Sequence, residues 1–242
     1  MDKHIFTVIA GPCAIENRDQ CLHIAENVKQ LGAHAFRGGA YKPRSSPFAF
    51  QGLGEEGLKI LQEVRVIMPV VTEATSLLNI DLVSENTDII QIGSRNMHNV
   101  ELLKKAGTKK NPIMLKRGYS ALIEDEWLMA AKYISEQGNN NILMCERGIR
   151  TFEPYTRNVL DFGAIFAVKQ FTDYPIIIDP SHATGRSEMI IPMSLAAFVA
   201  GADGIIVEVH DNPETALCDG HQAITIEQFS ELMFKLNKLS NS

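Results

Sequence analysis

The sequence predicts a single α/β domain folded as a closed (β/α)8 barrel, and three observations point to that fold class. Eight short apolar runs alternate with segments of helical periodicity, and near-continuous Val, Ile and Leu runs are typical of parallel strands buried on both faces. The runs end in charged, thiol or imidazole side chains, which is where such a barrel builds its active site. The length of 242 residues matches one barrel, for which about 250 residues is typical. An open doubly wound sheet is the alternative, but polar groups at every strand end favour closure.

The expected strands share an apolar run that is followed directly by polar or charged residues. In chain order they are FTVIAGPC (6–13), AHAFRGG (33–39), MPVVTE (68–73), DIIQIGSR (88–95), PIMLKR (112–117), ILMCER (142–147), PIIIDPSH (175–182) and GIIVEVH (204–210). Parallel strands of a barrel all end at one face, so their polar residues are expected at a common mouth.

The expected helices lie between these runs and carry apolar residues three or four positions apart. They cover 18–31, 55–64, 76–84, 99–107, 121–137, 158–171, a segment with Pro192 in its first turn that ends at Gly201, and a C-terminal helix after Thr225. Asn99 is an expected N-terminal cap, and Thr225 with Gln228 predicts a capping box. The longest loops, 40–53 and 211–224, are expected to be functional, as long loops in compact domains often are.

Composition narrows the class of protein. The net charge of −6 argues against a nucleic-acid partner, and no stretch approaches the ~20 apolar residues of a membrane span. No signal or transit peptide follows Met1, so we expect a cytoplasmic protein. The cysteines lack the spacing of a disulfide framework; they are Cys13, Cys21, Cys145 and Cys218.

A candidate metal site combines Cys13, His182, Glu208 and Asp219, which follow the first, seventh and eighth runs. These strands are neighbours in a closed barrel, and a thiol, an imidazole and two carboxylates suit Mn, Fe, Co or Zn better than Mg or Ca. The alternative is that the thiol and the imidazole only pack in the core. If Glu208 points inward, strand alternation also turns His210 inward, either toward substrate or into a hydrogen bond at the barrel mouth.

Cations dominate the other strand ends and their loops. They are Arg37, Lys42, Arg95, Lys116 and Arg147. Each one alone could be a salt-bridge partner, but five at one mouth would repel one another unless an anionic substrate, or carboxylates such as Glu73 and Glu146, neutralised them. Arg44, Ser45 and Ser46 form a second candidate phosphate site in the loop after the second strand, with a solvated turn as the alternative. The cations, the candidate phosphate site and the candidate metal site together indicate a reaction that joins two phosphorylated metabolites beside a metal.

The sequence also resembles a known family, the short type I beta 3-deoxy-D-arabino-heptulosonate-7-phosphate (DAHP) synthases. The similar segments run in the same order along nearly the whole chain. They are GPCAIE (11–16), FRGGAYKPRSSPFAFQG (36–52), QIGSRNMHN (91–99), LKRG (115–118), CERGIRTFEPYTRN (145–158), DPSHATGR (179–186) and EVHDNPETALCDG (208–220). The resemblance implies a metal-dependent transferase that condenses phosphoenolpyruvate with D-erythrose 4-phosphate and water and releases phosphate, the first step of the shikimate pathway.

The resemblance also implies roles for individual residues. It implies one divalent transition metal on Cys13, His182, Glu208 and Asp219, and phosphoenolpyruvate on Arg37, Lys42, Arg95, Lys116 and Arg147. It places erythrose 4-phosphate on Pro43, Arg44, Ser45 and Asp219, with Ser45 where the family commonly has Thr. Lys116 and Glu73 are the candidates for handling the attacking water, and His210 is a further catalytic candidate.

Several expectations complete this interpretation. The chain is expected to be one catalytic domain over residues 1–242, without a fused regulatory or chorismate mutase domain, and to form a homodimer or homotetramer. The alternatives in function are a 3-deoxy-D-manno-octulosonate 8-phosphate (KDO8P) synthase that uses arabinose 5-phosphate, and a non-catalytic barrel that binds phosphoenolpyruvate. The Lys42-Pro43-Arg44 sequence favours the four-carbon sugar. We also expect Cys218, next to Asp219, to form a disulfide with Cys13 when the metal is absent; the alternative is that Cys218 is only a packed loop residue.

Overall fold

The computed structural model describes residues 6–44 and 46–241 and has the predicted architecture. Eight parallel strands close into a barrel in the order of the chain. They are β1 (Thr7–Gly11), β2 (Ala35–Arg37), β3 (Val70–Ala74), β4 (Ile89–Ile92), β5 (Ile113–Lys116), β6 (Ile142–Glu146), β7 (Ile176–Ile178) and β8 (Gly204–Glu208). Pairing of β1 with β8, from Thr7 opposite Gly204 to Gly11 opposite Glu208, closes the sheet. The closed barrel is therefore confirmed and the open sheet is excluded.

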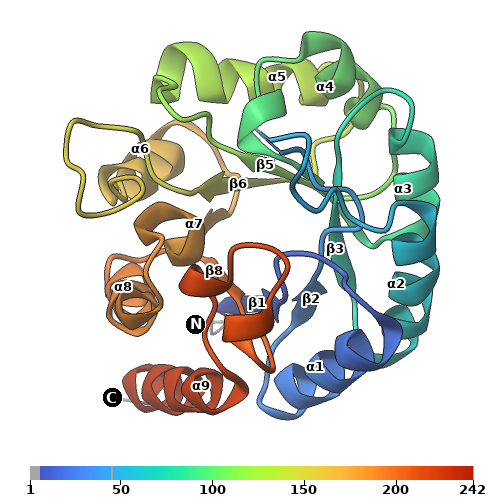
Figure 1. The fold of residues 1–242 in the computed structure, drawn as a ribbon. Coiled ribbons are helices and arrows are strands. Elements are labelled where there is room, and N and C mark those ends of the chain that lie inside the picture. The colour runs from blue at the N-terminus through green and yellow to red at the C-terminus, as the bar shows by residue number, and fades with distance from the viewer. Residues whose placement is uncertain (1–5, 45, 242) are drawn as a thin grey trace.

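Helices surround the strands, as the view along the barrel shows (Figure 1). The α-helices are α1 (Arg18–Gln30), α2 (Glu55–Ile67), α3 (Ile80–Asn86), α4 (Val100–Gly107), α5 (Met129–Ser135), α6 (Gly163–Phe171), α7 (Pro180–Thr184), α8 (Ser187–Val199) and α9 (Ile226–Ser240). Three 3-10 turns, η1 (Ser94–Asn96), η3 (Pro213–Thr215) and η4 (Gly220–Gln222), lie in the loops, and a π-helical segment, η2 (Ile123–Leu128), leads into α5.

The predicted helix caps are present. The Asn99 side chain accepts a hydrogen bond from the Leu102 backbone N–H at the start of α4. Thr225 and Gln228 form the reciprocal capping box of α9, each side chain accepting the other's backbone N–H. Such caps satisfy backbone donors that the first turn of a helix leaves free.

Two sequence predictions were wrong around the seventh strand. The strand ends at Ile178, and residues 180–184 form the short helix α7, because Asp179 caps it and Pro180 suits its first turn. The next helix, α8, begins at Ser187, so Pro192 lies inside it and not in its first turn. The predicted starts of α3 and α6 also lay several residues too early.

The interior of the barrel is filled by one apolar layer. Most strands contribute a buried residue to it: Ile9, Ala35, Val71, Met114, Cys145, Ile177 and Ile206. Side chains alternate between the two faces of a strand, so the residue two positions further along also points inward. Those positions hold Gly11, Arg37, Glu73, Lys116, Arg147, Asp179 and Glu208. The apolar layer is thus the floor beneath a polar mouth.

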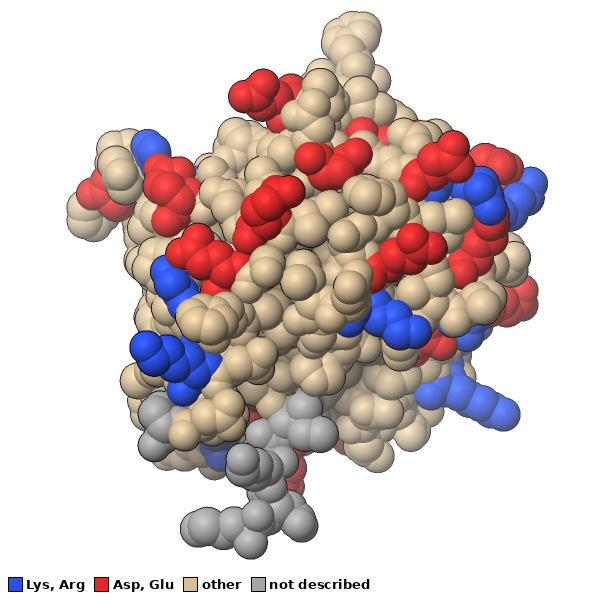
Figure 2. Space-filling view, turned by 90° about the horizontal axis from the view of Figure 1, so that it is seen from below, with Lys and Arg blue, Asp and Glu red and all other residues tan. Residues whose placement is uncertain are grey.

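One face of the molecule is mixed in charge. On the face in Figure 2, Asp and Glu side chains are interspersed with Lys and Arg. None of the helices formed by the described residues combines the length and apolar content needed to cross a bilayer.

Candidate active site

A polar cavity of about 290 Å³ opens at the carboxyl ends of the strands, where such barrels carry their active sites. All of the predicted cations line it, together with most of the other predicted site residues. The predicted residues in its wall are Arg37, Lys42, Pro43, Arg44, Glu73, Arg95, Lys116, Arg147, His182 and Asp219. Residues from both long loops, 40–53 and 211–224, are among them.

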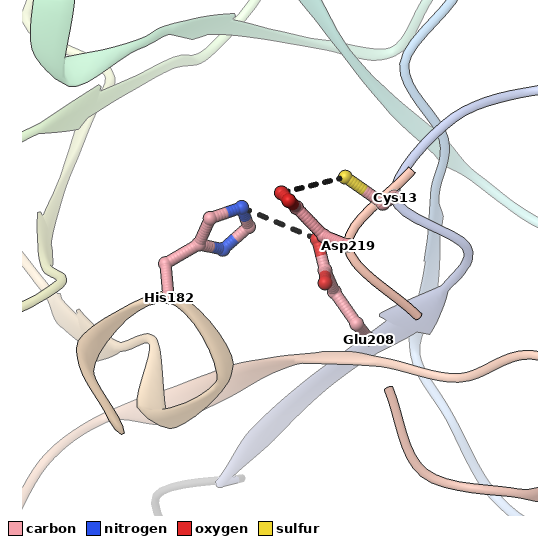
Figure 3. A group of neighbouring side chains, drawn as sticks. All are labelled: Cys13, His182, Glu208 and Asp219. Atoms are coloured by element: carbon pink, nitrogen blue, oxygen red, sulfur yellow. Dashed lines mark hydrogen bonds and ion pairs between the residues drawn. The ribbon is translucent and has the colours of Figure 1, made fainter. Parts of the chain in front are cut away.

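The four predicted metal ligands converge beside this cavity (Figure 3). One donor atom from each of Cys13, His182, Glu208 and Asp219 lies within 4.8 Å of the others. His182 Nε2 is 3.2 Å from Glu208 Oε1, and Cys13 Sγ is 3.5 Å from Asp219 Oδ2. The closure of β1 against β8 and the short helix α7 bring them together from opposite ends of the chain.

The protonation of His182 suits metal binding. Burial lowers the pKa of its imidazole to about 4, despite the opposing attraction of Asp179 and Glu208, so the ring is neutral near pH 7. In the neutral ring, Nδ1 carries the proton and donates to Asp179 Oδ2 at 2.8 Å. The unprotonated Nε2 therefore faces Glu208 Oε1, and two lone pairs 3.2 Å apart repel each other unless a cation lies between them.

The carboxylates of the cluster are ionised. Burial opposes the charge of Glu208 and Asp219, but His182 and neighbouring cations outweigh burial and lower both pKa values, that of Asp219 to about 2. Glu208 Oε1 accepts no hydrogen bond from the described residues, although Arg37 Nη2 lies 3.1 Å away as an ion-pair partner. The donor set and this orphaned buried oxygen fit a divalent transition metal.

The thiols of Cys13 and Cys218 form a hydrogen-bonded pair in this cluster. Their sulfur atoms are 3.2 Å apart. The hydrogen bond to Cys218, together with burial, raises the pKa of the Cys13 thiol well above its usual value. Lys42 Nζ donates to Cys13 Sγ at 3.0 Å and supplies the positive charge that stabilises a thiolate there.

Two buried guanidinium groups in the cavity wall have donors without a hydrogen-bond partner among the described residues. Arg37 and Arg147 are 5% and 2% exposed, yet Arg37 Nε and Nη1 and Arg147 Nη1 meet no acceptor among the described residues. Burial lowers the pKa of Arg147, whereas Glu208 and other anionic neighbours outweigh burial and raise that of Arg37. Unsatisfied buried donors cost about 1–3 kcal/mol each, more when charged, so this arrangement fits an anionic ligand.

The other predicted cations differ in their surroundings. Lys116 is buried, and its Nζ lies 2.5 Å from Asp179 Oδ2. Arg95 is exposed on η1 at the cavity wall. Arg44 Nη1 donates to Cys218 Sγ at 2.8 Å, and its neighbour Ser45 lies outside the described residues.

Asp219 occupies a special backbone position. Its φ of 53° places it in the left-handed region, and it is the one non-glycine residue of the described chain with positive φ. Such a conformation is unfavourable for a residue with a Cβ atom, and it is retained mainly where function requires it. Here it directs the carboxylate toward Cys13 and the cavity.

Glu73 and His210 lie in different environments. Gln91 Nε2 donates to Glu73 Oε2 at 3.1 Å, and a Cβ atom on Gly93 would come within 2.1 Å of the other carboxylate oxygen. Glu73 is thus held against the cavity wall. His210 is buried, its Nδ1 accepts a hydrogen bond from the Asn212 N–H, and it is not among the residues that line the cavity. Strand β8 ends at Glu208, before His210, so a catalytic role for His210 stays a prediction.

Sequence reasoning missed three residues of the site: Asp179, Arg157 and Tyr119. Tyr119 lies 4.7 Å from the Arg147 guanidinium, and Arg157 lines the cavity and donates to Gln222. The sequence predicts that the seventh run continues to His182, so it gives Asp179 no role of its own, whereas β7 ends at Ile178. The alternation that relates it to Ile177 was the available signal.

Comparison with known proteins agrees with this geometry. The sequence profile described as the DAHP synthetase I family matches residues 2–242. A protein of Thermotoga maritima named phospho-2-dehydro-3-deoxyheptonate aldolase is 50% identical over 98% of this chain and 70% of its own length. A protein of Syntrophobacter fumaroxidans named 2-dehydro-3-deoxyphosphooctonate aldolase is 32% identical over 96% of this chain and 86% of its own length.

Two solved structures of a DAHP synthase superpose closely on this chain. The crystal structure of the Thermotoga maritima phospho-2-dehydro-3-deoxyheptonate aldolase (DAHP synthase) superposes with a TM-score of 0.95 at 49% identity, covering 99% of this chain and 70% of that one. A truncated form of the 3-deoxy-D-arabino-heptulosonate 7-phosphate synthase from the same organism gives a TM-score of 0.91 at 46% identity, covering 99% and 88%. The chain therefore belongs to the DAHP synthetase I family.

Proposed function

We propose that this protein condenses phosphoenolpyruvate with D-erythrose 4-phosphate and water to give 3-deoxy-D-arabino-heptulosonate 7-phosphate and phosphate. The observation that carries the proposal is the pair of buried arginines, Arg37 and Arg147, which line one cavity beside a transition-metal donor set and have donors without a partner among the described residues. Higher identity to the heptonate aldolase, 50% against 32%, favours this reaction over KDO8P synthesis.

Cys13, His182, Glu208 and Asp219 would hold the metal. With a divalent transition metal bound, these residues would hold a Lewis acid that could polarise the aldehyde of the sugar phosphate. The neutral imidazole and the ionised carboxylates need no rearrangement of protons to serve as ligands.

The five cations would hold phosphoenolpyruvate, whose carboxylate and phosphate carry several negative charges. Arg37, Lys42, Arg95, Lys116 and Arg147 surround one cavity. Arg37 and Arg147 offer buried guanidinium donors, which bind planar carboxylates and phosphates in a defined orientation. The same charges stabilise phosphate as it leaves.

Erythrose 4-phosphate would occupy the side of the cavity formed by the loop after β2. Arg44 and Ser45 would hold its phosphate, with Pro43 in the same loop and Asp219 near the reacting end of the sugar; Pro43, Arg44 and Asp219 line the cavity. Pro43 stiffens the loop, because a proline ring restricts its φ angle. Arg44 would exchange its contact with the Cys218 thiol for the phosphate.

The reaction needs a bond between C3 of phosphoenolpyruvate and the aldehyde carbon, then addition of water at C2 and departure of phosphate. Lys116 and Glu73, which both line the cavity, would orient that water and take its proton. Lys116 is anchored by Asp179, and Glu73 is anchored by Gln91. We assign no step to His210. A cytoplasmic homodimer or homotetramer stays a prediction.

One assay tests the proposal. Loss of phosphoenolpyruvate is followed with erythrose 4-phosphate or arabinose 5-phosphate, after chelation and after addition of each metal. We expect metal-dependent turnover with the four-carbon sugar. Faster turnover with arabinose 5-phosphate identifies a KDO8P synthase. Binding of phosphoenolpyruvate without turnover of either sugar identifies a non-catalytic barrel.

A further inference from the structure

We propose that Asp179 is a positioning residue that ties the metal ligand His182 to the candidate catalytic residue Lys116. The inference rests on the proposed function, because it assigns Asp179 a part in the same reaction. Asp179 follows β7 and is fully buried; it is not among the residues that line the cavity and is not a member of the metal donor set.

Each carboxylate oxygen of Asp179 has a separate task. Oδ2 lies 2.5 Å from Lys116 Nζ and 2.8 Å from His182 Nδ1, so one oxygen joins the two side chains. Oδ1 accepts the backbone N–H of His182 at 3.0 Å and caps α7. The Asp179 backbone N–H donates to the Glu146 carbonyl at 2.8 Å, which holds the carboxylate at the end of β7.

The contact with Nδ1 determines which ring nitrogen is free. A carboxylate accepts but cannot donate, so the proton of the neutral imidazole resides on Nδ1 and the lone pair is on Nε2. Nε2 is the atom that faces Glu208 and the other ligands. Carboxylate partners of this kind orient metal-binding histidines, and their loss weakens metal binding by about 10–100-fold.

The contact with Lys116 determines where its ammonium lies. Among the described residues, Asp179 is the one hydrogen-bond acceptor of Nζ, and the lysine side chain is 5% exposed. Its four-carbon stem is flexible, so without this anchor Nζ is not held at the cavity wall. Displacement of a catalytic group by about 1 Å can reduce turnover about 100-fold.

Asp179→Asn tests both contacts, because the amide has a single acceptor oxygen and no charge. It can cap α7 or accept from Lys116 and His182 Nδ1, but not do both. We expect the dissociation constant for Co²⁺, measured by competition with a chromophoric chelator, to rise roughly 10–100-fold. We expect kcat to fall by about 100-fold, with a smaller change in the KM for phosphoenolpyruvate.

Asp203→Asn is the matched control at the other end of β7. Asp203 Oδ2 accepts the backbone N–H of Ile176 at 2.8 Å, and Oδ1 accepts from Lys169 Nζ at 2.9 Å. This substitution also removes a carboxylate that binds a lysine and a backbone donor, but far from the cavity. It should lower the melting temperature while metal affinity and kcat stay within twofold of the original values.

Lys116→Met separates the two arms of the proposal. Alone it should leave Co²⁺ affinity unchanged, because the path to His182 stays intact. In the double variant with Lys116→Met and Asp179→Asn, the fold loss in kcat should be smaller than the product of the two single-variant losses, as is typical of coupled residues. Additive losses in kcat would show that Asp179 does not act through Lys116.

Different outcomes overturn the role of Asp179 and the proposed function. Unchanged Co²⁺ affinity and kcat in Asp179→Asn overturn the inference even if the original enzyme turns over erythrose 4-phosphate. A protein without turnover whose Co²⁺ affinity still falls in Asp179→Asn overturns the proposed function instead. If Asp179→Asn does not fold, ¹⁵N NMR of the unsubstituted metal-free protein decides: an Nε2–H tautomer of His182 would refute the orienting role.

Discussion

The sulfur atoms of Cys13 and Cys218 lie 3.2 Å apart, although 205 positions separate the two residues in the chain. Both thiols are free and buried. Cys13 comes from the end of β1 and Cys218 from the loop after β8, so closure of the barrel brings them together. Cys13 is also a proposed metal ligand, and metal binding and disulfide formation therefore compete for one sulfur.

Because the two thiols are in contact, we expect Cys13 and Cys218 of the metal-free protein to be oxidised to a disulfide in air. Dioxygen can accept two electrons from the thiols, which lose two protons as the S–S bond forms, and peroxide is the other product. We expect air-exposed metal-free protein to lose two titratable thiols and its activity, with recovery after reduction. Saturation with metal should prevent both losses. Cys218→Ser should keep its remaining thiols through the same incubation, whereas unchanged thiol counts in the original protein would rule the disulfide out.

Replacement of Lys116 by Met should abolish turnover without removing the metal. The thioether side chain fills similar space but has neither the charge nor the proton of the ammonium. We expect kcat to fall at least about 100-fold, the lower range for loss of an acid–base group. Metal content, measured by elemental analysis, should not change. Near-normal turnover would contradict the role of Lys116.

Replacement of Arg147 by Met should weaken phosphoenolpyruvate binding and stabilise the free protein. A buried guanidinium with an unpaired Nη1 is unfavourable until an anion binds, so its removal relieves that cost. Loss of a charged hydrogen bond is worth about 1.5–3 kcal/mol, and the KM should rise roughly 10–100-fold. The Arg150 guanidinium also lies over the Tyr119 ring, 5.1 Å from its centroid, but Arg150 is exposed. Arg150→Met is therefore the control, with little effect expected on the KM or on the melting temperature. A lower melting temperature in Arg147→Met would contradict the argument.

Removal of the metal should lower thermal stability. A ligand that binds only the folded state stabilises it by about 2.7 kcal/mol at 100 times its dissociation constant. We expect chelation to lower the melting temperature and Mn²⁺ or Co²⁺ to restore it. Glu208→Gln removes the charge of one proposed ligand and should suppress most of the metal-induced increase. An equal increase in both proteins would place the bound metal elsewhere.

Replacement of Gly93 by Ala tests Glu73 from outside the residue itself. The added Cβ would lie 2.1 Å from a Glu73 carboxylate oxygen, so the carboxylate must move. We expect kcat to fall roughly 10–100-fold, as expected for a displaced catalytic group. Metal content should not change, because the ligands are on other strands. Glu73→Gln should lower kcat by a similar factor; full activity in both variants would exclude Glu73 from the reaction.

The sequence by itself determined the fold and most of the cavity wall. Buried parallel strands require long apolar runs, and inward positions recur every second residue, so charged side chains at the run ends had to meet at one mouth. Arg37, Lys116 and Arg147 followed from that rule. The donor types of Cys13, His182, Glu208 and Asp219 likewise indicated a transition metal before any geometry was known.

Only the tertiary structure decided how these residues depend on one another. The end of β7 depends on a competition between strand pairing and the capping of α7 by Asp179, which local sequence does not resolve. The joint contact of Asp179 with Lys116 and His182 spans three elements. The left-handed backbone of Asp219 and the approach of Cys218 to Cys13 arise from closure of the barrel. Contacts of this range depend on packing, which places residues far apart in the chain within hydrogen-bond distance.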